Sequence, residues 1–213
     1  MWLSVLMTVL VGYLLGNLNG AVSMSNLLGK KDVREHGSGN AGLTNFLRMF
    51  GPGSALLVIV IDMLKAVIAC VTGKLLLEPF GYGMEGLMIG AVAVSLGHDF
   101  PALLGFRGGK GVLCGFTVAL VADWRCALLI LAVFGLSLWL TRYVSLSSIL
   151  GALVFAVVFP ILHRQSLFVT VTGSAVGLFI IFMHRSNIAR LLKGTEKKAT
   201  FSQFRKKKTE NTP

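Results

Sequence analysis

Long apolar runs constrain the fold of this sequence more than any other feature. A spanning helix needs about 20 predominantly apolar residues to cross the roughly 30 Å hydrocarbon core of a bilayer. Hydrophobic residues make up 54% of the 213 residues and charged residues only 14%, against about 25% charged residues in an average soluble domain. We therefore expect an all-α polytopic membrane protein. Five runs are clear: Trp2 to Leu28, Ser54 to Leu77, Cys126 to Leu140, Val144 to Leu162 and Leu167 to Met183.

Two shorter apolar runs, Met84 to Gly97 and Gly111 to Ala122, are ambiguous, because each is below the usual spanning length of about 17 residues. If only five runs span, the glycine-rich segment near Lys110 lies outside the cell. It is then separated from two segments of similar polar chemistry, residues 37–48 and 183–196, which lie inside. We favour seven spans, with the N-terminus outside and the C-terminus in the cytoplasm, because positive charge marks the cytoplasmic side. Sixteen lysines and arginines then lie inside, and three lie outside: Lys74, Arg125 and Arg164.

The remaining composition fits a single domain. We expect residues 1–198 to form one transmembrane domain and residues 199–213 a disordered basic tail in the cytoplasm, attached to anionic lipid through residues 205–208. The net charge is +11, but the basic residues lie between and after apolar runs, so we expect no nucleic-acid partner. Cys70, Cys114 and Cys126 lack the spacing of metal ligands, so we expect neither a metal nor a cofactor.

Two ionisable residues interrupt the second apolar run. Asp62 and Lys65 are three positions apart and therefore share one face of a helix. An ionisable residue inside a membrane is a functional hypothesis by default. Since each supplies the other's counter-charge, we predict a structural ion pair.

The loop after the first run contains Gly37-Ser38-Gly39-Asn40-Ala41-Gly42, which matches the dinucleotide-binding pattern G-x-G-x-x-G. Such a site also needs a preceding buried strand, whereas residues 30–36 are mostly charged, so we reject a Rossmann site. Glycines nevertheless let backbone N–H groups converge on an anion, and a short helix over residues 43–50 would present Arg48 to a phosphate. We favour a phosphate site over an ordinary flexible loop because polar side chains are dense here: Ser38, Asn40, Thr44, Asn45 and Arg48.

A second loop, residues 98–111, places three glycines around a lysine in Phe106-Arg107-Gly108-Gly109-Lys110-Gly111. It is not a Walker A loop, because Gly111 stands where a serine or threonine would bind Mg²⁺. The glycines still make a phosphate cradle that opens into a helix at Val112. His98 could act as a base, but we favour a capping or backbone-binding role for a histidine at a helix end.

A third segment, residues 183–196, combines an apolar face over residues 188–192 with polar groups. An interfacial amphipathic helix is the simplest interpretation. His184 and Asn187 are three positions apart, so they share one side at the membrane boundary. We predict that these two residues belong to a site.

Together, the three segments resemble the acyl-phosphate-dependent glycerol-3-phosphate acyltransferases of bacteria, the PlsY family. The resemblance is carried by Gly37 to Arg48 (GSGNAGLTNFLR), His98 to Val112 (HDFPALLGFRGGKGV) and His184 to Lys197 (HRSNIARLLKGTEK). Asp62 and Lys65 also look like the family's second span, and the order of the motifs fits nearly the whole chain.

The resemblance implies transfer of a fatty acyl group from acyl phosphate to the 1-hydroxyl of glycerol 3-phosphate, which gives lysophosphatidate and phosphate. It further implies a bacterial inner membrane enzyme, active at the cytoplasmic face, that performs the first committed step of phospholipid synthesis. The implied partners are these two substrates and membrane lipids. The resemblance implies catalytic or active-site roles for Ser38, Arg48, His184 and Asn187, a structural role for Glu196, and a glycerol-phosphate-binding loop made of Gly108, Gly109, Lys110 and Gly111. From the glycines and polar side chains of the loops themselves, we add to the phosphate-binding set Gly37, Gly39, Asn40, Thr44, Asn45 and Arg107.

The implied reaction agrees with the chemistry of the loops, because cationic groups and backbone amides would offset the repulsion between two phosphates. An anion transporter would also carry cationic glycine loops, but internal repeats are expected of one and no clear repeat is present. A non-catalytic lipid-binding scaffold explains the basic tail but not Ser38, Arg48, Lys110 and His184 together. For the proton of the attacking hydroxyl, we favour a substrate phosphate as base over His184.

Overall fold

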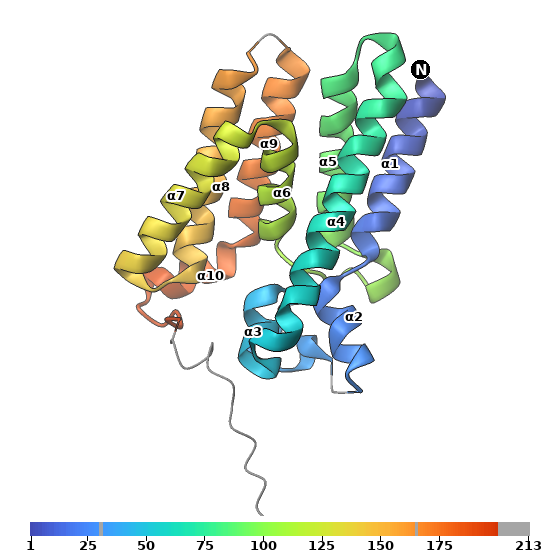
Figure 1. Cartoon of the computed structure of the whole chain (residues 1–213). Coiled ribbons are helices and arrows are strands. Elements are labelled where there is room, and N and C mark those ends of the chain that lie inside the picture. The colour runs from blue at the N-terminus through green and yellow to red at the C-terminus, as the bar shows by residue number, and fades with distance from the viewer. Residues whose placement is uncertain (30–31, 165, 200–213) are drawn as a thin grey trace, which may run out of the picture.

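A computed structural model of the chain is all-helical over the residues it describes, 1–29, 32–164 and 166–199 (Figure 1). This confirms the predicted fold class, whereas the predicted lipid-binding residues 205–208 lie outside the described residues. In chain order the helices are α1 (Trp2–Asn17), α2 (Gly20–Leu27), η1 (Val33–Glu35), α3 (Leu43–Phe50), α4 (Pro52–Leu77), η2 (Glu78–Phe80), α5 (Gly83–Asp99), η3 (Ala102–Leu104), α6 (Val112–Ala122), α7 (Trp124–Thr141), α8 (Val144–Leu162), α9 (Leu167–Met183) and α10 (Arg185–Leu192).

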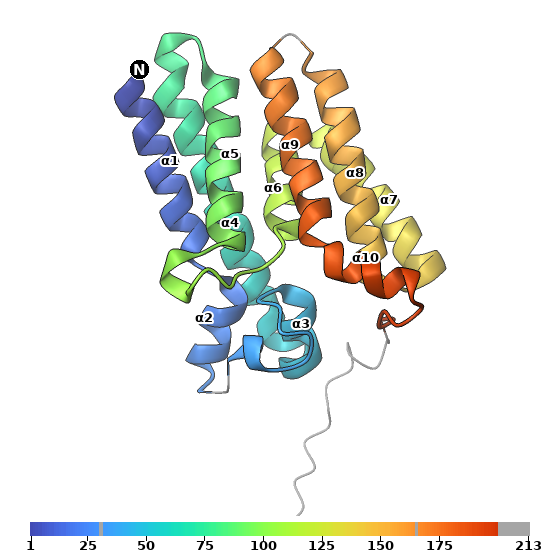
Figure 2. The ribbon, with the colours of Figure 1, turned by 180° about the vertical axis from the view of Figure 1, so that it is seen from behind.

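The long helices form two groups with α6 between them (Figure 1). The first group is α1, α4 and α5, and the second is α7, α8 and α9; α2 and α3 lie below the first group, and α10 turns aside below α9 (Figure 2). Small residues let the helices approach closely, as is common in membranes. A Cβ atom on Gly73 of α4 would lie 2.1 Å from the Gly86 carbonyl oxygen of α5, and one on Gly177 of α9 would lie 2.7 Å from Ala152 of α8.

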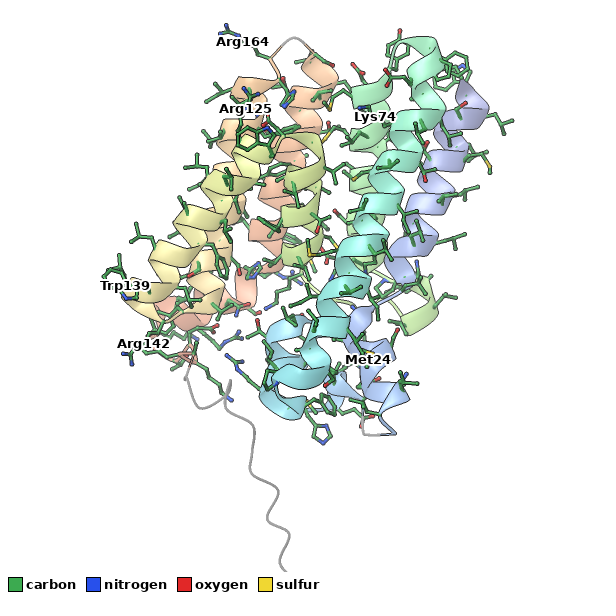
Figure 3. All side chains as sticks on the ribbon, viewed as in Figure 1. Met24, Lys74, Arg125, Trp139, Arg142 and Arg164 are labelled. Carbon is green, nitrogen blue, oxygen red and sulfur yellow. The ribbon has the colours of Figure 1, made fainter. Side chains whose placement is uncertain are left out.

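Most of the predicted runs are helices of nearly the predicted extent. Within the described part of the chain, four helices are long and apolar enough to cross a membrane, namely α4, α5, α7 and α8, or six if the bent pairs α1–α2 and α9–α10 each count as one span. The short run from Gly111 to Ala122 forms α6, whose 11 residues rise only about 16 Å. The chain nevertheless reverses direction after α6, as in the seven-run arrangement. Figure 3 places Lys74, Arg125 and Arg164 at one end of the bundle and Arg142 at the other.

The outer surface of the bundle is apolar, as expected for a protein in contact with lipid. The side chains of Trp2, Trp139 and Leu167 are between 77% and 79% exposed, and Figure 3 shows Trp139 pointing away from the bundle. Buried ionisable groups such as Asp62 and Lys65 lie inside it. This inversion of the usual soluble pattern supports an integral membrane protein.

The predicted apolar run from Trp2 to Leu28 forms two helices, because the chain bends by 42° between α1 and α2. The break leaves backbone groups without helical partners, which is costly where water is absent. Residues of α4 supply those partners: Asp62 Oδ1 accepts from Gly20 N–H at 3.1 Å, and Lys65 Nζ donates to the Leu18 carbonyl at 2.5 Å. Lys65 Nζ also lies 2.9 Å from Asp62 Oδ1, so the pair makes contact and, in addition, holds the break in place.

Candidate active site

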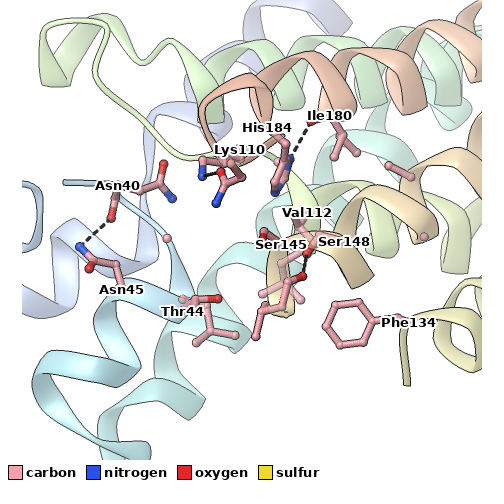
Figure 4. Close-up of a pocket in the computed structure, with 18 of the residues that line it drawn as sticks. Asn40, Thr44, Asn45, Lys110, Val112, Phe134, Ser145, Ser148, Ile180 and His184 are labelled. Atoms are coloured by element: carbon pink, nitrogen blue, oxygen red, sulfur yellow. Dashed lines mark hydrogen bonds between the residues drawn. The ribbon is translucent and has the colours of Figure 1, made fainter. Parts of the chain in front are cut away.

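A cavity of about 720 Å³ connects the polar loops with the apolar interior of the bundle. Its polar end is lined by residues of the first loop and α3, by Lys110 and by residues of α10, and its apolar walls by Phe116 of α6, Phe134 of α7 and Phe155 of α8. Figure 4 shows Lys110 and His184 close together, with Thr44 and Phe134 on other sides of the same space. The cavity can therefore receive a molecule with an anionic head and an apolar tail.

Most of the residues predicted for the site do meet in this cavity, although they come from five separate parts of the chain. Those that line it are Gly37, Ser38, Asn40, Thr44, Asn45, Arg48, Asp62, Lys110, Gly111, His184, Asn187 and Glu196. Those that do not line it are Gly39, Lys65, Arg107, Gly108 and Gly109. Arg107 is exposed on the loop surface, which separates its side chain from the phosphate-binding set predicted for it.

Asn45 organises the first loop instead of offering its amide to a phosphate. Its Oδ1 accepts from the Ser38 N–H at 3.0 Å, and its Nδ2 donates to the carbonyls of Val33, His36 and Asn40 at 2.8, 3.0 and 3.1 Å. In this arrangement both ends of the Asn45 amide are used by the loop, so the amide offers no free N–H for the phosphate contact that was predicted for it. Gly37 has φ +65, and a Cβ there would lie 2.2 Å from Asn45 Oδ1, so glycine is required for the loop to close on Asn45.

Gly108 and Gly109 pack against the end of α5, which differs from the predicted cradle of free amides. The N–H groups of these two glycines donate to the carbonyls of Asp99 and His98, at 3.2 and 3.1 Å. A Cβ on Gly108 would lie 2.0 Å from the His98 carbonyl oxygen, so no larger residue fits there. The two glycines therefore place Lys110 and Gly111 in the cavity but do not themselves present N–H groups to an anion.

A chain of polar contacts crosses the cavity from the second loop to the third segment. Lys110 Nζ donates to Asn187 Oδ1, Asn187 Nδ2 donates to Glu196 Oε1 at 2.7 Å, and Arg190 Nε donates to Glu196 Oε2 at 2.6 Å. Glu196 thus orients the Asn187 amide so that its oxygen meets the lysine. These hydrogen bonds fix the positions of two cationic side chains, Lys110 and Arg190, beside the cavity.

The surroundings of Lys110 disfavour its charged form. Burial is the main cause that lowers the pKa of Lys110 to about 8, Arg190 and Arg48 lower it further, and Glu196 opposes them. A bound phosphate would supply the missing negative charge. The side chains of Lys110, Arg48 and Arg190 therefore form a cationic wall of the cavity.

His184 lies just beyond the end of α9 and is neutral. Its Nδ1 lies 2.8 Å from the Ile180 carbonyl, to which only an N–H can be bonded, so Nε2 has a free lone pair in the neutral ring. Burial lowers the pKa of His184 to about 4, and the Lys110 charge also lowers it, although the bond to Ile180 has the opposite effect. A neutral histidine at neutral pH can accept a hydrogen bond from a hydroxyl group.

Five polar residues that line the cavity are not among those predicted from the sequence: Ser145, Ser148, Arg190, Thr195 and Lys197. Arg190 follows Asn187 by three positions, a helical spacing that could have indicated a shared face. Ser145 sits inside an apolar run, where a serine most often bonds to its own helix, so no signal in the sequence distinguished it.

The comparisons with known proteins agree with this geometry. The family model described as glycerol-3-phosphate acyltransferase matches residues 6–194. This chain belongs to the glycerol-3-phosphate acyltransferase family. Among its relatives, the glycerol-3-phosphate acyltransferase of Thermoanaerobacter pseudethanolicus is 40% identical over 192 residues, which cover 90% of this chain and 94% of the relative. That of Finegoldia magna is 35% identical over 190 residues, covering 89% and 93%.

Solved structures of the family have the same fold. The crystal structure of PlsY, an integral membrane glycerol 3-phosphate acyltransferase, in its glycerol 3-phosphate form aligns with a TM-score of 0.83 at 33% identity, covering 94% of this chain and 98% of that one. Its lysophosphatidic acid form aligns with a TM-score of 0.80 at the same identity and coverage. The chain is thus an integral membrane glycerol-3-phosphate acyltransferase, and the resemblance inferred from its three motifs is confirmed.

Proposed function

We propose that this acyltransferase uses acyl phosphate as its donor and acylates the 1-hydroxyl of glycerol 3-phosphate. The hydroxyl oxygen attacks the acyl carbon, the bond between that carbon and the phosphate oxygen breaks, and lysophosphatidate and phosphate leave. The observation that carries the proposal is the cavity itself, whose cationic end meets apolar walls from α6, α7 and α8. Such a cavity suits a donor with a phosphate directly next to a long apolar chain.

The proposed roles follow from the positions of the charges. Arg48, Lys110 and Arg190 offset the repulsion between two phosphates and hold the reactants close together. Ser38 is exposed at the polar end of the cavity, where its hydroxyl can contact a substrate. Asn187 positions Lys110, and Glu196 serves the site by orienting Asn187.

For the proton of the attacking hydroxyl, we favour a phosphate oxygen of the donor as the base. By analogy with phosphoserine, whose second pKa is about 6, a phosphate oxygen of the donor titrates in a suitable range, and it is already beside the acyl carbon. His184 then orients a substrate by a hydrogen bond. Phosphate is a good leaving group, so no strong general acid and no acyl-enzyme are needed.

The proposed setting is the cytoplasmic face of a bacterial inner membrane, where this reaction would be the first committed step of phospholipid synthesis. Support comes from the charge distribution, since Lys74, Arg125 and Arg164 lie together at the end of the bundle opposite Arg142 (Figure 3). The cavity lies at the Arg142 end, the side predicted to be cytoplasmic.

The choice of donor can be tested with the purified protein in proteoliposomes. Palmitoyl phosphate, palmitoyl-CoA and palmitoyl-acyl carrier protein are offered separately, each with and without glycerol 3-phosphate. We expect lysophosphatidate only from the acyl phosphate, with one phosphate released per product and none without glycerol 3-phosphate. Efficient use of either thioester would refute the proposed donor, and release of phosphate without acceptor would indicate a phosphatase.

A further inference from the structure

His98 lies at the C-terminal end of α5 and lines the cavity, although it is only 4% exposed. Its Nδ1 is 2.8 Å from Lys65 Nζ. A lysine ammonium has only donors, so Nδ1 must accept, and the hydrogen of the neutral ring is on Nε2. A doubly protonated ring would set an N–H against the ammonium, so the arrangement selects one neutral tautomer.

The other contacts of Lys65 keep its ammonium directed at His98. Lys65 Nζ also lies 2.9 Å from Asp62 Oδ1, 2.5 Å from the Leu18 carbonyl oxygen and 3.3 Å from the Gly16 carbonyl oxygen. Asp62 Oδ1 is 3.8 Å from His98 Nδ1, too far for a hydrogen bond, and therefore does not compete for that nitrogen. Lys65 therefore determines the tautomer of His98. The position of Lys65 is fixed in turn by Asp62 on the same helix, α4, and by the carbonyl of Leu18 at the break between α1 and α2.

The free edge of the His98 ring is kept open by the second loop. A Cβ on Gly109 would lie 2.2 Å from His98 Nε2, so any other residue at that position would cover this nitrogen or displace the ring. Within residues 1–29, 32–164 and 166–199, Nε2 has no hydrogen-bond acceptor. The ring thus carries an N–H donor on the cavity wall, near Lys110.

We infer that His98 is a catalytic residue that donates a hydrogen bond from Nε2–H to an anionic oxygen of a bound substrate, with Lys65 as its positioning residue. The inference rests on the proposed function of the same cavity. The oxygen is either a phosphate oxygen or the carbonyl oxygen that gains charge as the hydroxyl attacks. The base role considered for His98 from the sequence is excluded by this tautomer, because Nδ1 is occupied and Nε2 already carries its hydrogen. No covalent bond to His98 forms or breaks.

A pair of amide substitutions separates this role from a structural one. In His98→Asn the amide oxygen can replace Nδ1 as the acceptor for Lys65, but no atom reaches the position of Nε2. In His98→Gln the amide nitrogen reaches the position of Nε2 and can donate, while the contact with Lys65 is lost. We expect Asn to lower turnover about 10²–10³-fold, as when one preorganised donor is removed, and Gln to stay within about tenfold of wild type.

The steady-state constants identify which oxygen is bound. A fall in kcat with both KM values unchanged assigns the donor to the carbonyl oxygen, whereas a rise of about tenfold or more in one KM assigns it to the phosphate of that substrate. An active Asn variant together with an inactive, folded Gln variant would overturn the inference and leave His98 as a structural partner of Lys65. If the Asn variant does not fold, the folded Gln variant decides: activity supports the inference and inactivity refutes it.

His163→Gln serves as the matched control, because His163 follows α8 at the opposite end of the bundle and contacts Asp123 at 3.2 Å. It should match the wild type in kcat and both KM values. All variants are assayed with palmitoyl phosphate and glycerol 3-phosphate. A wild-type protein without activity would refute the proposed donor, whereas an active wild type with a fully active Asn variant would refute only the role of His98.

Discussion

The pH dependence of kcat/KM should report the titration of Lys110. Burial lowers the pKa of this lysine to about 8, and the nearby Arg190 and Arg48 add to the effect. Only the ammonium form attracts a phosphate, so the favourable charge is present below about pH 8 and is lost as the pH rises through that value. Since kcat/KM reports the free enzyme, its decline should begin near pH 8.

The size of the decline follows from the same pKa. About half of the free enzyme keeps the Lys110 charge at pH 8 and about a tenth at pH 9, so kcat/KM for glycerol 3-phosphate should fall about fivefold between pH 8 and pH 9 and should approach about tenfold per pH unit above pH 9. A bound phosphate favours the ammonium form, so kcat should decline only at a higher pH. Below about pH 7 the second ionisation of the substrate phosphates, near 6 by analogy with phosphoserine, would affect the profile instead.

The assay is lysophosphatidate formation at saturating acyl donor and constant ionic strength, between pH 6.5 and 9.5. Lys110→Arg should remove the decline, because a guanidinium stays charged throughout this range, even if its absolute activity is lower. Glu196→Gln removes a charge that raises the lysine pKa and should move the decline to lower pH. A flat wild-type profile up to pH 9.5, or an unchanged decline in Lys110→Arg, would contradict the reasoning.

Three further predictions concern the loops and the proton. Single cysteines introduced at positions 38, 110 and 187 on a Cys-free background should all react with a membrane-impermeant reagent from the cytoplasmic side only; reaction of position 110 from outside would rule out the seven-run topology. His184→Gln should keep kcat within about tenfold of wild type if a substrate phosphate is the base, whereas a loss near the upper part of the 10²–10⁴-fold range of general-base catalysis, with KM unchanged, would assign that role to His184. Asn45→Ala removes four hydrogen bonds of the first loop, which at about 0.5–1.5 kcal/mol each should lower kcat at least tenfold and reduce thermal stability; an unchanged melting temperature and kcat would show that Ser38 does not depend on this loop geometry.

The positions of most helices could be predicted because an apolar run in lipid has few alternatives to a helix. The predicted runs from Ser54 to Leu77 and from Val144 to Leu162 differ from α4 and α8 by at most two residues. The break between α1 and α2 could not be predicted in this way, because it lies inside an apolar run. It is stabilised by Asp62 and Lys65, which lie more than 40 positions further along the chain.

The sequence predicted most residues of the candidate site, but it predicted their individual contacts less well. Ser38, Lys110 and His184 do meet at one cavity, as phosphate chemistry and the family resemblance indicated. The inward-facing amide of Asn45 and the bond from Gly109 to α5 depend on tertiary packing, which the local pattern of glycines and polar residues does not encode. For that reason a glycine-rich motif was interpreted as a cradle of free N–H groups when part of it is a tight packing contact.

We propose that both substrates meet in one cavity and that the acyl group passes directly between them. To test this, the enzyme is incubated with acyl phosphate and radiolabelled phosphate, without glycerol 3-phosphate, and label is measured in the recovered acyl phosphate. Direct transfer predicts no exchange above the enzyme-free control, while lysophosphatidate forms normally once glycerol 3-phosphate is added. Exchange at a rate comparable to turnover would demonstrate an acyl-enzyme and contradict the account.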